Sequence, residues 1–525
     1  MSQPWFYPDK VSAAPGEDLT IFASSPVSDC TLIVSRVGAS TVEVARFENI
    51  EIGDHPTPED ADQNGCNWPS VLTFPIGDEW RSGYYDLKLE TPDGAFTQHF
   101  VCIRKAANAK PASAAIVLAT NTYMAYNYWG GSNSYADVEG LLSGRLSRED
   151  SPKGAIGRLS RMRPYPQGLF APAEGAPRLI NMYIRDKDQL ALPGDPEWNQ
   201  KHRPSPYDGS ACFLSKWEHR FAAWMENSGY EIDYLTDHDF ESENDELVDA
   251  YSAVLIVGHS EYWSRKQRNV LESYTHSGGN LIVFSGNTCY WKVRWEDDGT
   301  TMIAHKWRGH MDDPLWASKE TRKEATHLWS HEAFEQPETE LIGLSFIYGG
   351  YHRLCMCAAR GAAGFTIYND EHWALAGSDL YYGDVLGMTV PLVGYENDGC
   401  PIKFNEDGLP VPDGGIGVPQ NLEIIGFAPA TLGESARSPY PKMIPSEESE
   451  VRARIAYGNA EPRTQERLMR GHAVIASFKL GAGEVFNSGT TEWAHGLDAG
   501  DPFVEKITHN VFERFGVERD KTRGK

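Results

Sequence analysis

The sequence predicts an α/β protein with a mostly parallel, doubly wound sheet, preceded by a small all-β sandwich domain. Three observations support this prediction. Short β-type runs fill residues 1–105, helical patterns alternate with apolar runs after them, and these later runs are continuously apolar. Strands that alternate with helices imply βαβ units, and continuous apolar strands are typical of a sheet that is covered on both faces.

Residues 1–105 favour an Ig-like β-sandwich. Their β-branched and aromatic runs are short, and Gly, Pro and Asp separate them at turns. The runs are DLTIFASS, CTLIVSRVG, YYDLKLETPDG and FTQHFVCIRK. A linker from Ala106 to Ala114 follows. We therefore expect a second, larger α/β domain over residues 114–516 and a short tail over 517–525.

The larger domain contains four apolar runs, and each predicts a buried strand. In chain order they are Ala114–Thr120, Tyr230–Thr236, Ala253–Gly258 and Asn280–Gly286. The expected order in the sheet is second, first, third, fourth, which is one of the common doubly wound arrangements. Residues 145–210 interrupt this domain as a polar segment rich in Pro and Gly. Such a long irregular insertion is typically a functional loop or lid.

Helices are predicted between the strands from periodicity and end signals. Residues 242–251 resemble a short capped helix, and Ser264 with Gln267 three residues on is the capping-box signature of another. Asp501 and Pro502 are a cap and first residue for the last helix. One further helix is predicted by a stripe at helical spacing, formed by Trp217, Phe221, Trp224 and Met225.

The chain beyond Leu341 contains further strand-like runs. The last of them, AVIASFKLGAGEVFNSG, predicts a hairpin that turns through Gly481, Ala482 and Gly483. These runs extend the β content of the larger domain toward its end.

The composition excludes several classes of partner. The formal net charge of −26 argues against nucleic acid and against an anionic membrane surface. No apolar run approaches the roughly 18 residues that a membrane helix needs, and the first residues lack a signal-peptide pattern. The eight cysteines include no CxxC, which fits buried thiols in a reducing compartment. We expect a soluble, cytoplasmic protein.

Polar residues follow the predicted strands at the edge where such sheets bind ligands. NTYMAYNYWGG follows the first strand, HSEYW the third and NTCYW the fourth. If the first and third strands are neighbours, one crevice contains residues from both. These are Asn121, Thr122, Tyr126, His259 and Glu261.

His259 and Glu261 are two residues apart, so on an extended chain both side chains point the same way. A structural interpretation makes Glu261 a helix cap and His259 a core residue. The position of both residues at the end of a predicted strand favours a functional interpretation instead. Ser260 raises a third possibility, because GHSEY partly resembles the G-x-S-x-G turn of serine hydrolases. Tyr262, however, replaces the second glycine of that turn.

Tyrosines are concentrated after the first predicted strand. Packing or stacking on a carbohydrate would explain them. A catalytic use would require tyrosinate, and a phenol with a pKa of about 10 ionises at neutral pH only beside a strong cation such as a trivalent metal. The residues concerned are Tyr123, Tyr126, Tyr128 and Tyr135, with Tyr165 further on.

Six motifs in this order resemble the large (beta) subunit-like family of N,N-dimethylformamidase. They are TYMAYNYWGG, RPY, GHSEYW, FSGNTCYW, GYEND and SGTTEW, and the similarity covers roughly residues 114–516. The resemblance implies a catalytic domain similar to class-I glutamine amidotransferases without their cysteine nucleophile. It also implies a mononuclear Fe(III) held by two tyrosines and one glutamate.

Carried over to this chain, the resemblance implies Tyr126, Tyr165 and Glu261 as metal ligands. The second tyrosine is the least secure position, because relatives read more like SFDRPY where this chain has SRMRPY. Tyr135 or Tyr183 are alternatives for it. The implied catalytic residues around the metal are His259, Glu396, Asn287 and Thr122.

The chemistry implied is hydrolysis of the C–N bond of a small linear or N-alkyl amide by a metal-activated water. Glu396 would accept the proton of that water, while His259 and Asn287 would donate to the oxyanion, a role worth about 3 kcal/mol per donor. The implied partners are a small amide substrate, a small accessory subunit and further copies of the chain. The alternatives are a serine hydrolase that uses Ser260 and a non-catalytic, carbohydrate-binding amidotransferase-like protein.

Overall fold

Two β-sheets make up the first hundred or so residues of the chain. The computed structural model describes residues 3–135, 156–171, 211–242, 244, 246–352, 363–432 and 446–520. The first sheet has the order β1-β3-β6 and the second the order β2-β8-β7-β4-β5. The strands are β1 (Trp5–Pro8), β2 (Ser12–Ala13), β3 (Asp18–Ser24), β4 (Cys30–Val37), β5 (Thr41–Ile50), β6 (Ser70–Pro75), β7 (Gly83–Glu90) and β8 (Phe96–Ile103).

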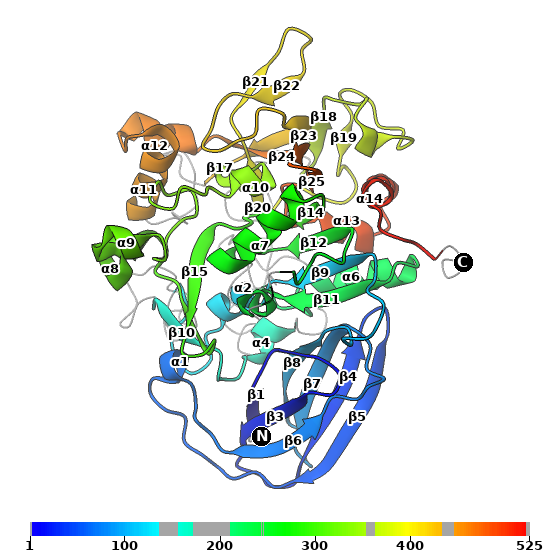
Figure 1. Ribbon diagram of the computed structural model, residues 1–525, viewed down its shortest axis with the longest axis vertical. Coiled ribbons are helices and arrows are strands. Elements are labelled where there is room, and N and C mark those ends of the chain that lie inside the picture. Colours follow the sequence, from blue (N-terminus) through cyan, green and yellow to red (C-terminus); the bar gives the residue numbers. More distant parts are fainter. Residues whose placement is uncertain are drawn as a thin grey trace, which may run out of the picture.

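These N-terminal strands enclose a core of their own. In β4, buried residues alternate with partly exposed ones, as the two-residue period of a strand with one face inward requires. Leu32, Leu87 and Val101 are fully buried in this core. The N-terminal sheets lie at one end of the long axis of the molecule, opposite the hairpin of β21 (Ile402–Phe404) and β22 (Pro410–Pro412) (Figure 1).

A nine-stranded sheet forms the centre of the rest of the chain. Its order is β11-β9-β12-β14-β25-β24-β23-β18-β19. The first four of these strands appear in the predicted order of second, first, third and fourth along the chain, so that prediction is confirmed. The strands are β9 (Ala114–Leu118), β11 (Ile232–Thr236), β12 (Ala253–Gly258), β14 (Asn280–Ser285), β18 (Phe365–Ile367), β19 (Val385–Leu386), β23 (Glu423–Ala430), β24 (Gly471–Leu480) and β25 (Gly483–Asn487).

The prediction of a mostly parallel, doubly wound sheet similar to that of the glutamine amidotransferases is wrong, because the sheet is mixed. The pairs from β11 to β25 are parallel, but every pair from β25 to β19 is antiparallel. The physical reason is visible at Gly481 and Ala482, where a tight turn joins β24 and β25 as the predicted hairpin. The chain therefore reverses direction without the helical crossover that a parallel pair needs.

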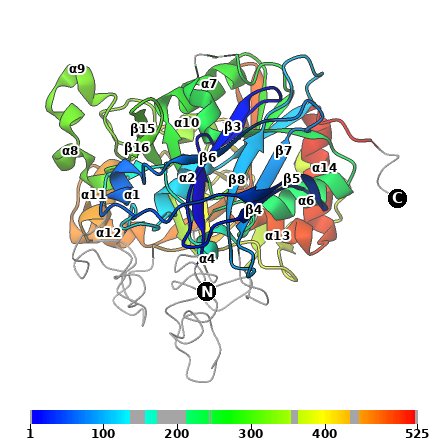
Figure 2. The same ribbon diagram turned by 90° about the horizontal axis from the view of Figure 1, so that it is seen from below.

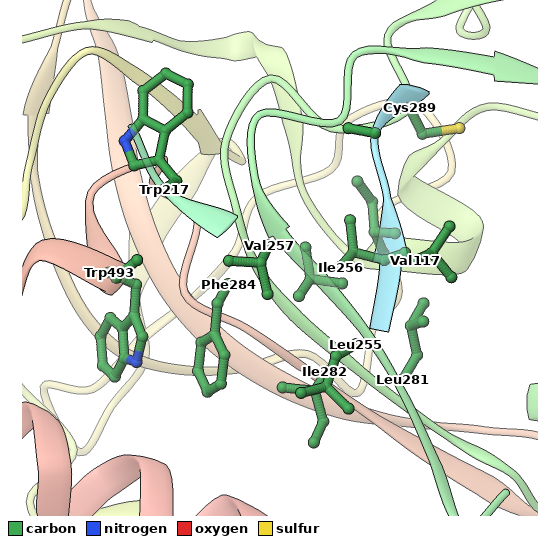
Figure 3. Packing of buried hydrophobic residues seen from close by; sticks show 14 of the residues in the cluster. Val117, Trp217, Leu255, Ile256, Val257, Leu281, Ile282, Phe284, Cys289 and Trp493 are labelled. Carbon is green, nitrogen blue, oxygen red and sulfur yellow. The ribbon is translucent and has the colours of Figure 1, made fainter. Parts of the chain in front are cut away.

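The parallel strands are buried almost throughout, as their continuous apolar runs predict. All of β12 is buried, as is β14 after its first residue. Figure 3 shows Leu255, Ile256 and Val257 of β12 beside Leu281 and Ile282 of β14. Phe284 stacks on Trp493 with ring centroids 5.2 Å apart (Figure 3).

Helices pack on this sheet, and two of them begin at the caps predicted from the sequence. In α7 (Arg265–His276), Ser264 accepts a hydrogen bond from the Gln267 amide, and in α14 (Pro502–Arg514) Asp501 is the cap. The predicted stripe lies in α6 (Glu218–Asn227), which buries Phe221, Trp224 and Met225. The helix predicted at 242–251 does not form, because residues 246–250 are in turns.

The remaining elements lie around this framework. In Figure 2, α6, α13 (Trp493–Asp498) and α14 group on one side of the molecule, and α11 (Ser446–Tyr457) and α12 (Pro462–Leu468) group on the other. Most of the predicted insertion at 145–210 lies outside the described residues. No described helix is long and apolar enough to cross a membrane. The other strands are β10 (Arg158–Ser160), β13 (Tyr262–Ser264), β15 (Trp291–Glu296), β16 (Thr301–Ile303), β17 (Ser345–Tyr351) and β20 (Glu396–Gly399).

Short helical turns complete the described chain. The short α-helices are α1 (Ala61–Asn64), α2 (Thr120–Tyr126), α4 (Gln167–Phe170), α8 (Gly309–Asp312), α9 (Lys319–Arg322) and α10 (Thr339–Ile342). The 3₁₀ helices are η2 (Asp237–Glu241), η3 (Lys306–Arg308), η4 (Pro314–Ala317) and η5 (Trp373–Leu375). Among these, α2 and η3 bring residues to the site described next.

Candidate active site

The carboxyl ends of three neighbouring parallel strands deliver polar residues to one place. Helix α2 begins just after β9, the segment 259–261 follows β12, and Asn287 follows β14. Because these strands are parallel and adjacent, their carboxyl ends meet at one edge of the sheet. The position predicted from the sequence is therefore the position of a real side-chain cluster.

His259 lies at the centre of this cluster. Its Nε2 atom is 3.3 Å from Oε2 of Glu261, 3.2 Å from Oε2 of Glu396 and 3.4 Å from the hydroxyl of Tyr126. Its other ring nitrogen, Nδ1, lies 3.1 Å from the carbonyl oxygen of Gly286. A carbonyl can only accept, so Nδ1 carries a proton and Nε2 is the nitrogen that faces the cluster.

Four residues hold Glu261 in place. Its Oε1 atom accepts a 2.6 Å hydrogen bond from Nε1 of Trp291, which is in β15. Its Oε2 atom accepts from the hydroxyls of Tyr126 and Tyr135 at 3.2 and 3.0 Å. Its backbone amide donates to the hydroxyl of Thr122 in α2 at 3.0 Å. Thr122 thus fixes the backbone of Glu261, and its hydroxyl has a positioning role here.

The phenols of Tyr126 and Tyr135 are neighbours of the carboxylate and of each other. The Tyr135 and Tyr126 hydroxyl oxygens lie 3.0 Å apart, and the Tyr262 hydroxyl donates to Tyr135 at 2.7 Å. The Tyr126 and Tyr135 rings have centroids 4.6 Å apart. Tyr135, one of the alternatives for the second tyrosine, is thus the tyrosine that lies beside Tyr126 and Glu261.

Tyr165 lies in another environment. Its ring contacts His99 and Phe100 of β8 and Phe170 of α4, at centroid distances of 5.0, 6.2 and 6.1 Å. Burial raises the pKa of its phenol, with a further contribution from Cys212 and opposing ones from Arg163 and Arg161. None of these partners belongs to the cluster around Glu261. The other alternative, Tyr183, lies outside the described residues.

Glu396 and Asn287 are the other polar side chains of the cluster. Nδ2 of Asn287 donates to Oε2 of Glu396 at 3.2 Å. Asn287 has a φ of 52°, in the left-handed region that a non-glycine residue adopts at some cost. The carboxylate of Asp398 stabilises this turn, because it accepts the amides of Asn287 at 2.9 Å and of Thr288 at 3.1 Å.

Burial and mutual charge shift the pKa values of the cluster. Burial alone would lower the pKa of His259, but the Glu396 and Glu261 carboxylates outweigh it and raise the pKa to about 9. Burial, with the charge of Glu261, raises the pKa of Glu396 to about 7. For Glu261 burial acts upward, yet His259 and Lys306 hold its pKa below the ordinary value. Burial and the neighbouring carboxylates raise the pKa of both Tyr126 and Tyr135 well above 10.

Ser260 is placed differently from a hydrolytic nucleophile. Its hydroxyl accepts a 2.9 Å hydrogen bond from Nε1 of Trp263, and its side chain is buried. His259, the adjacent residue, turns its Nε2 atom toward Glu261 and Glu396 instead. A serine nucleophile needs a base within hydrogen-bonding reach.

A cation could be held by the oxygens of Tyr126, Tyr135 and Glu261. No group of three or more His, Cys, Asp or Glu side chains suited to a metal occurs in the part of the chain that the structure describes. These three oxygens lie 3.0–3.2 Å from one another. Oxygens that share an octahedral cation at about 2.1 Å are about 3.0 Å apart, which fits this spacing.

Several residues of the cluster have no strong signal in the sequence. Tyr262 and Trp291 stand beside predicted site residues in the motifs GHSEYW and NTCYW, so proximity along the chain could have indicated them. Asp398 is part of GYEND. Lys306, by contrast, lies in no motif, and only the structure brings it to Tyr135.

Comparison with known proteins gives one extensive match and two short ones. A family model described as N,N-dimethylformamidase beta subunit-like, C-terminal, matches residues 33–509. The N,N-dimethylformamidase beta subunit of an Alcaligenes species is 33% identical over 70 residues, which is 13% of this chain and 9% of that protein. The beta subunit of Paracoccus aminophilus is 30% identical over 70 residues, with the same coverage.

One solved structure resembles this chain only distantly. A cycloisomaltooligosaccharide glucanotransferase from Paenibacillus sp., complexed with cycloisomaltoheptaose, has a TM-score of 0.16 and 9% identity over 55% of this chain and 53% of that one. The match with the curated relatives spans about a tenth of their length, whereas the family model spans most of this chain. The chain therefore belongs to the N,N-dimethylformamidase beta subunit-like family.

Proposed function

We propose that this protein is a hydrolase that cleaves the C–N bond of a small linear or N-alkyl amide. The observation that carries the proposal is a buried cluster in which Tyr126, Tyr135 and Glu261 bring three oxygens together, while Nε2 of His259 contacts both Glu261 and Glu396. Membership in the dimethylformamidase-like family supports the reaction class. In this proposal the cluster supplies ligands for a metal, a carboxylate that carries protons and donors that stabilise negative charge.

The cofactor of this proposal is a mononuclear Fe(III) held by Tyr126, Tyr135 and Glu261. Two phenolates and one carboxylate carry three negative charges, which match a hard trivalent cation. The raised pKa values of both phenols mean that they ionise only when such a cation replaces their protons. The chemistry supplied by bound iron is polarisation of the amide carbonyl and acidification of a water molecule.

Glu396 is the proton carrier of the reaction. With a pKa raised to about 7, its carboxylate takes a proton from the attacking water and later delivers it to the departing nitrogen. The C–O bond forms as the water attacks, the C–N bond then breaks, and the products are a carboxylic acid and an amine. One group can perform both transfers because its pKa lies close to neutral pH.

His259 and Asn287 position Glu396 and stabilise negative charge. Both donate toward Glu396, and His259 is locked in place by the carbonyl of Gly286. Donors fixed in this way need no reorganisation when negative charge develops on the carbonyl oxygen of the substrate. Each such donor typically lowers the activation free energy by about 3–4 kcal/mol.

Aromatic rings surround the imidazole and favour a small, partly apolar substrate. The rings of Trp217 and Tyr395 lie 6.0 and 5.8 Å from His259 by centroid distance, and Trp217 is fully buried. Such walls exclude bulk water and leave few polar contacts for a long substrate. Because both curated relatives are named beta subunits, we include a second kind of subunit as a partner in this proposal.

The test uses the full chain purified after expression with iron. Elemental analysis and the visible absorption spectrum measure iron and its tyrosinate ligation, and a screen of formamide, N-methylformamide, N,N-dimethylformamide and acetamide measures amine release. We expect one iron per chain, a visible charge-transfer band and release of amine from at least one amide. Iron-free, colourless protein would contradict the cofactor, and iron-loaded protein inactive on every amide, with or without a partner subunit, would contradict the reaction.

A further inference from the structure

Lys306 is a buried lysine in an unusual backbone conformation. It is 3% exposed and has a φ of 56° at the start of η3. A buried ammonium group needs compensating contacts, and a non-glycine residue in the left-handed region persists only where its surroundings enforce it. Residues held in such strained conformations cluster at functional sites.

The contacts of Lys306 converge on the residues that hold Glu261. Its Nζ atom lies 3.4 Å from the ring centroid of Tyr135 and 5.2 Å from that of Trp291, and it donates to the carbonyl oxygen of Ser134 at 3.3 Å. Tyr135 and Trp291 each bond the Glu261 carboxylate, through Oε2 and Oε1 respectively. The ammonium group therefore covers the ring of Tyr135 while the hydroxyl of Tyr135 reaches Glu261.

We propose that Lys306 is a positioning residue of the active site, which holds Tyr135 beside Glu261 and places a positive charge over the Tyr135 ring. The inference rests on the proposed function and deepens it. A cation over the ring is attracted to the π electrons, and this attraction grows when the phenol becomes phenolate. Through the bond to Ser134, the same group also fixes the backbone that precedes Tyr135.

Lys292 provides a matched control within the same chain. It is also buried, at 2% exposure, and its Nζ atom lies 4.0 Å from the ring centroid of Phe334 and 5.4 Å from that of Trp329. It also donates to a backbone carbonyl, that of Lys323. Its ring partners are not ligands of the proposed iron, so it has the packing of Lys306 without the connection to Tyr135.

The experiment compares Lys306→Met and Lys292→Met with the wild type and uses two readouts. The first is hydrogen exchange in a peptide that covers Ser132–Tyr135, measured on iron-free protein. The second is the visible spectrum and iron content after loading with Fe(III). Lys306→Met is expected to speed exchange in this peptide and to lower the iron content, whereas Lys292→Met leaves both unchanged.

The direction of the spectral change is also fixed by the geometry. The charge-transfer band moves an electron from tyrosinate to iron, and a cation over the ring makes that electron harder to remove. Loss of the cation in Lys306→Met should therefore shift the band to longer wavelength, and Lys306→Arg, which keeps the charge, should restore it.

The outcomes separate this inference from the proposed function. A wild type that binds no iron contradicts the proposed function, while hydrogen exchange still decides whether Lys306 positions Tyr135. Unchanged exchange in Lys306→Met overturns the positioning role. Exchange, iron content and band position that change equally in Lys306→Met and Lys292→Met also overturn it, because they would report a general loss of stability.

Discussion

Nε2 of His259 lies 3.2 Å from Oε2 of Glu396, and this contact joins the end of β12 to the start of β20. Both side chains are buried, so each is the main source of charge felt by the other. The contact raises the pKa of His259, while burial and Glu261 raise the pKa of Glu396. A carboxyl group with a near-neutral pKa, fixed by an imidazole, is the feature on which the proposed proton transfer depends.

Glu396→Gln is expected to abolish most activity without unfolding the protein. The amide keeps the shape and can still contact Asn287, but it cannot accept a proton. General base catalysis typically contributes about 100- to 10,000-fold, so kcat should fall by that amount. Steady-state amine release measures the loss, and iron content serves as the control because Glu396 is not a ligand. Retained activity in an iron-loaded Gln variant would contradict the role of Glu396.

The activity of the wild type should rise with pH through about 7. The proposed base is the ionised carboxylate of Glu396, whose pKa is raised to about 7, first by burial and then by Glu261. Below that pH the carboxyl is protonated and cannot accept a proton, so kcat/KM falls as the pH is lowered. The measurement is the pH profile of amine release in the wild type and in Glu396→Gln. A Gln variant with the same acidic limb would assign that limb to another group.

The sequence predicts the part of the fold that depends on local signals. The strands β9, β11, β12 and β14 are continuous apolar runs, and the caps at Ser264 and Asp501 are single residues with a defined bond to make. Such features can be predicted from residues that are close together in the chain. The position of His259 and Glu261 at a strand end follows from the same signals.

Long-range pairing is what the sequence does not predict. The runs after Leu341 have the composition of strands, but the sequence does not show which strands they pair with. Their antiparallel pairing beside the parallel strands depends on turns and on partners far along the chain. The choice between Tyr135 and Tyr165 also depends on long-range structure. Both tyrosines follow the first predicted strand, and only the structure shows that Tyr135 is the one that contacts Glu261. Lys306 reaches Tyr135 from a part of the chain with no motif of its own.

Tyr135→Phe and Tyr165→Phe should have different effects on iron binding. The Tyr135 hydroxyl lies 3.0 Å from Oε2 of Glu261, whereas Tyr165 packs against His99 and Phe100. We expect Tyr135→Phe to lose most of its visible band and iron, and Tyr165→Phe to keep both. Visible spectra and elemental analysis of the two variants decide the matter. Iron lost from the Tyr165 variant alone would return the second ligand to the position first predicted from RPY.

Ser260→Ala should retain activity within a few-fold of the wild type. The hydroxyl of Ser260 accepts a bond from Trp263, but Nε1 of Trp263 also donates to the carbonyl oxygen of Ser260 at 3.0 Å. The indole therefore keeps a partner in the variant, and little stability should be lost. Amine release by the Ala variant is the measurement. Complete inactivity of a folded, iron-loaded Ala variant would support the serine-hydrolase alternative.

Asp398→Ala should destabilise the protein and reduce activity together. Asp398 is the acceptor for the amides of Asn287 and Thr288, so its loss leaves two buried N–H groups without a partner. Each unpaired N–H group costs about 1–3 kcal/mol, so the free energy of unfolding should fall by about 2–6 kcal/mol. Urea denaturation followed by fluorescence measures this change.

Asn287→Gly is the matched control for this turn. Glycine adopts a φ of 52° without strain, so the variant should keep its stability, yet it removes the donor to Glu396 and should lose activity. The pair of variants therefore separates support of the turn from the function of the side chain in it. An Asp398→Ala protein as stable as the wild type would mean that other groups hold the turn, and Asn287→Gly with full activity would remove Asn287 from the proposed reaction.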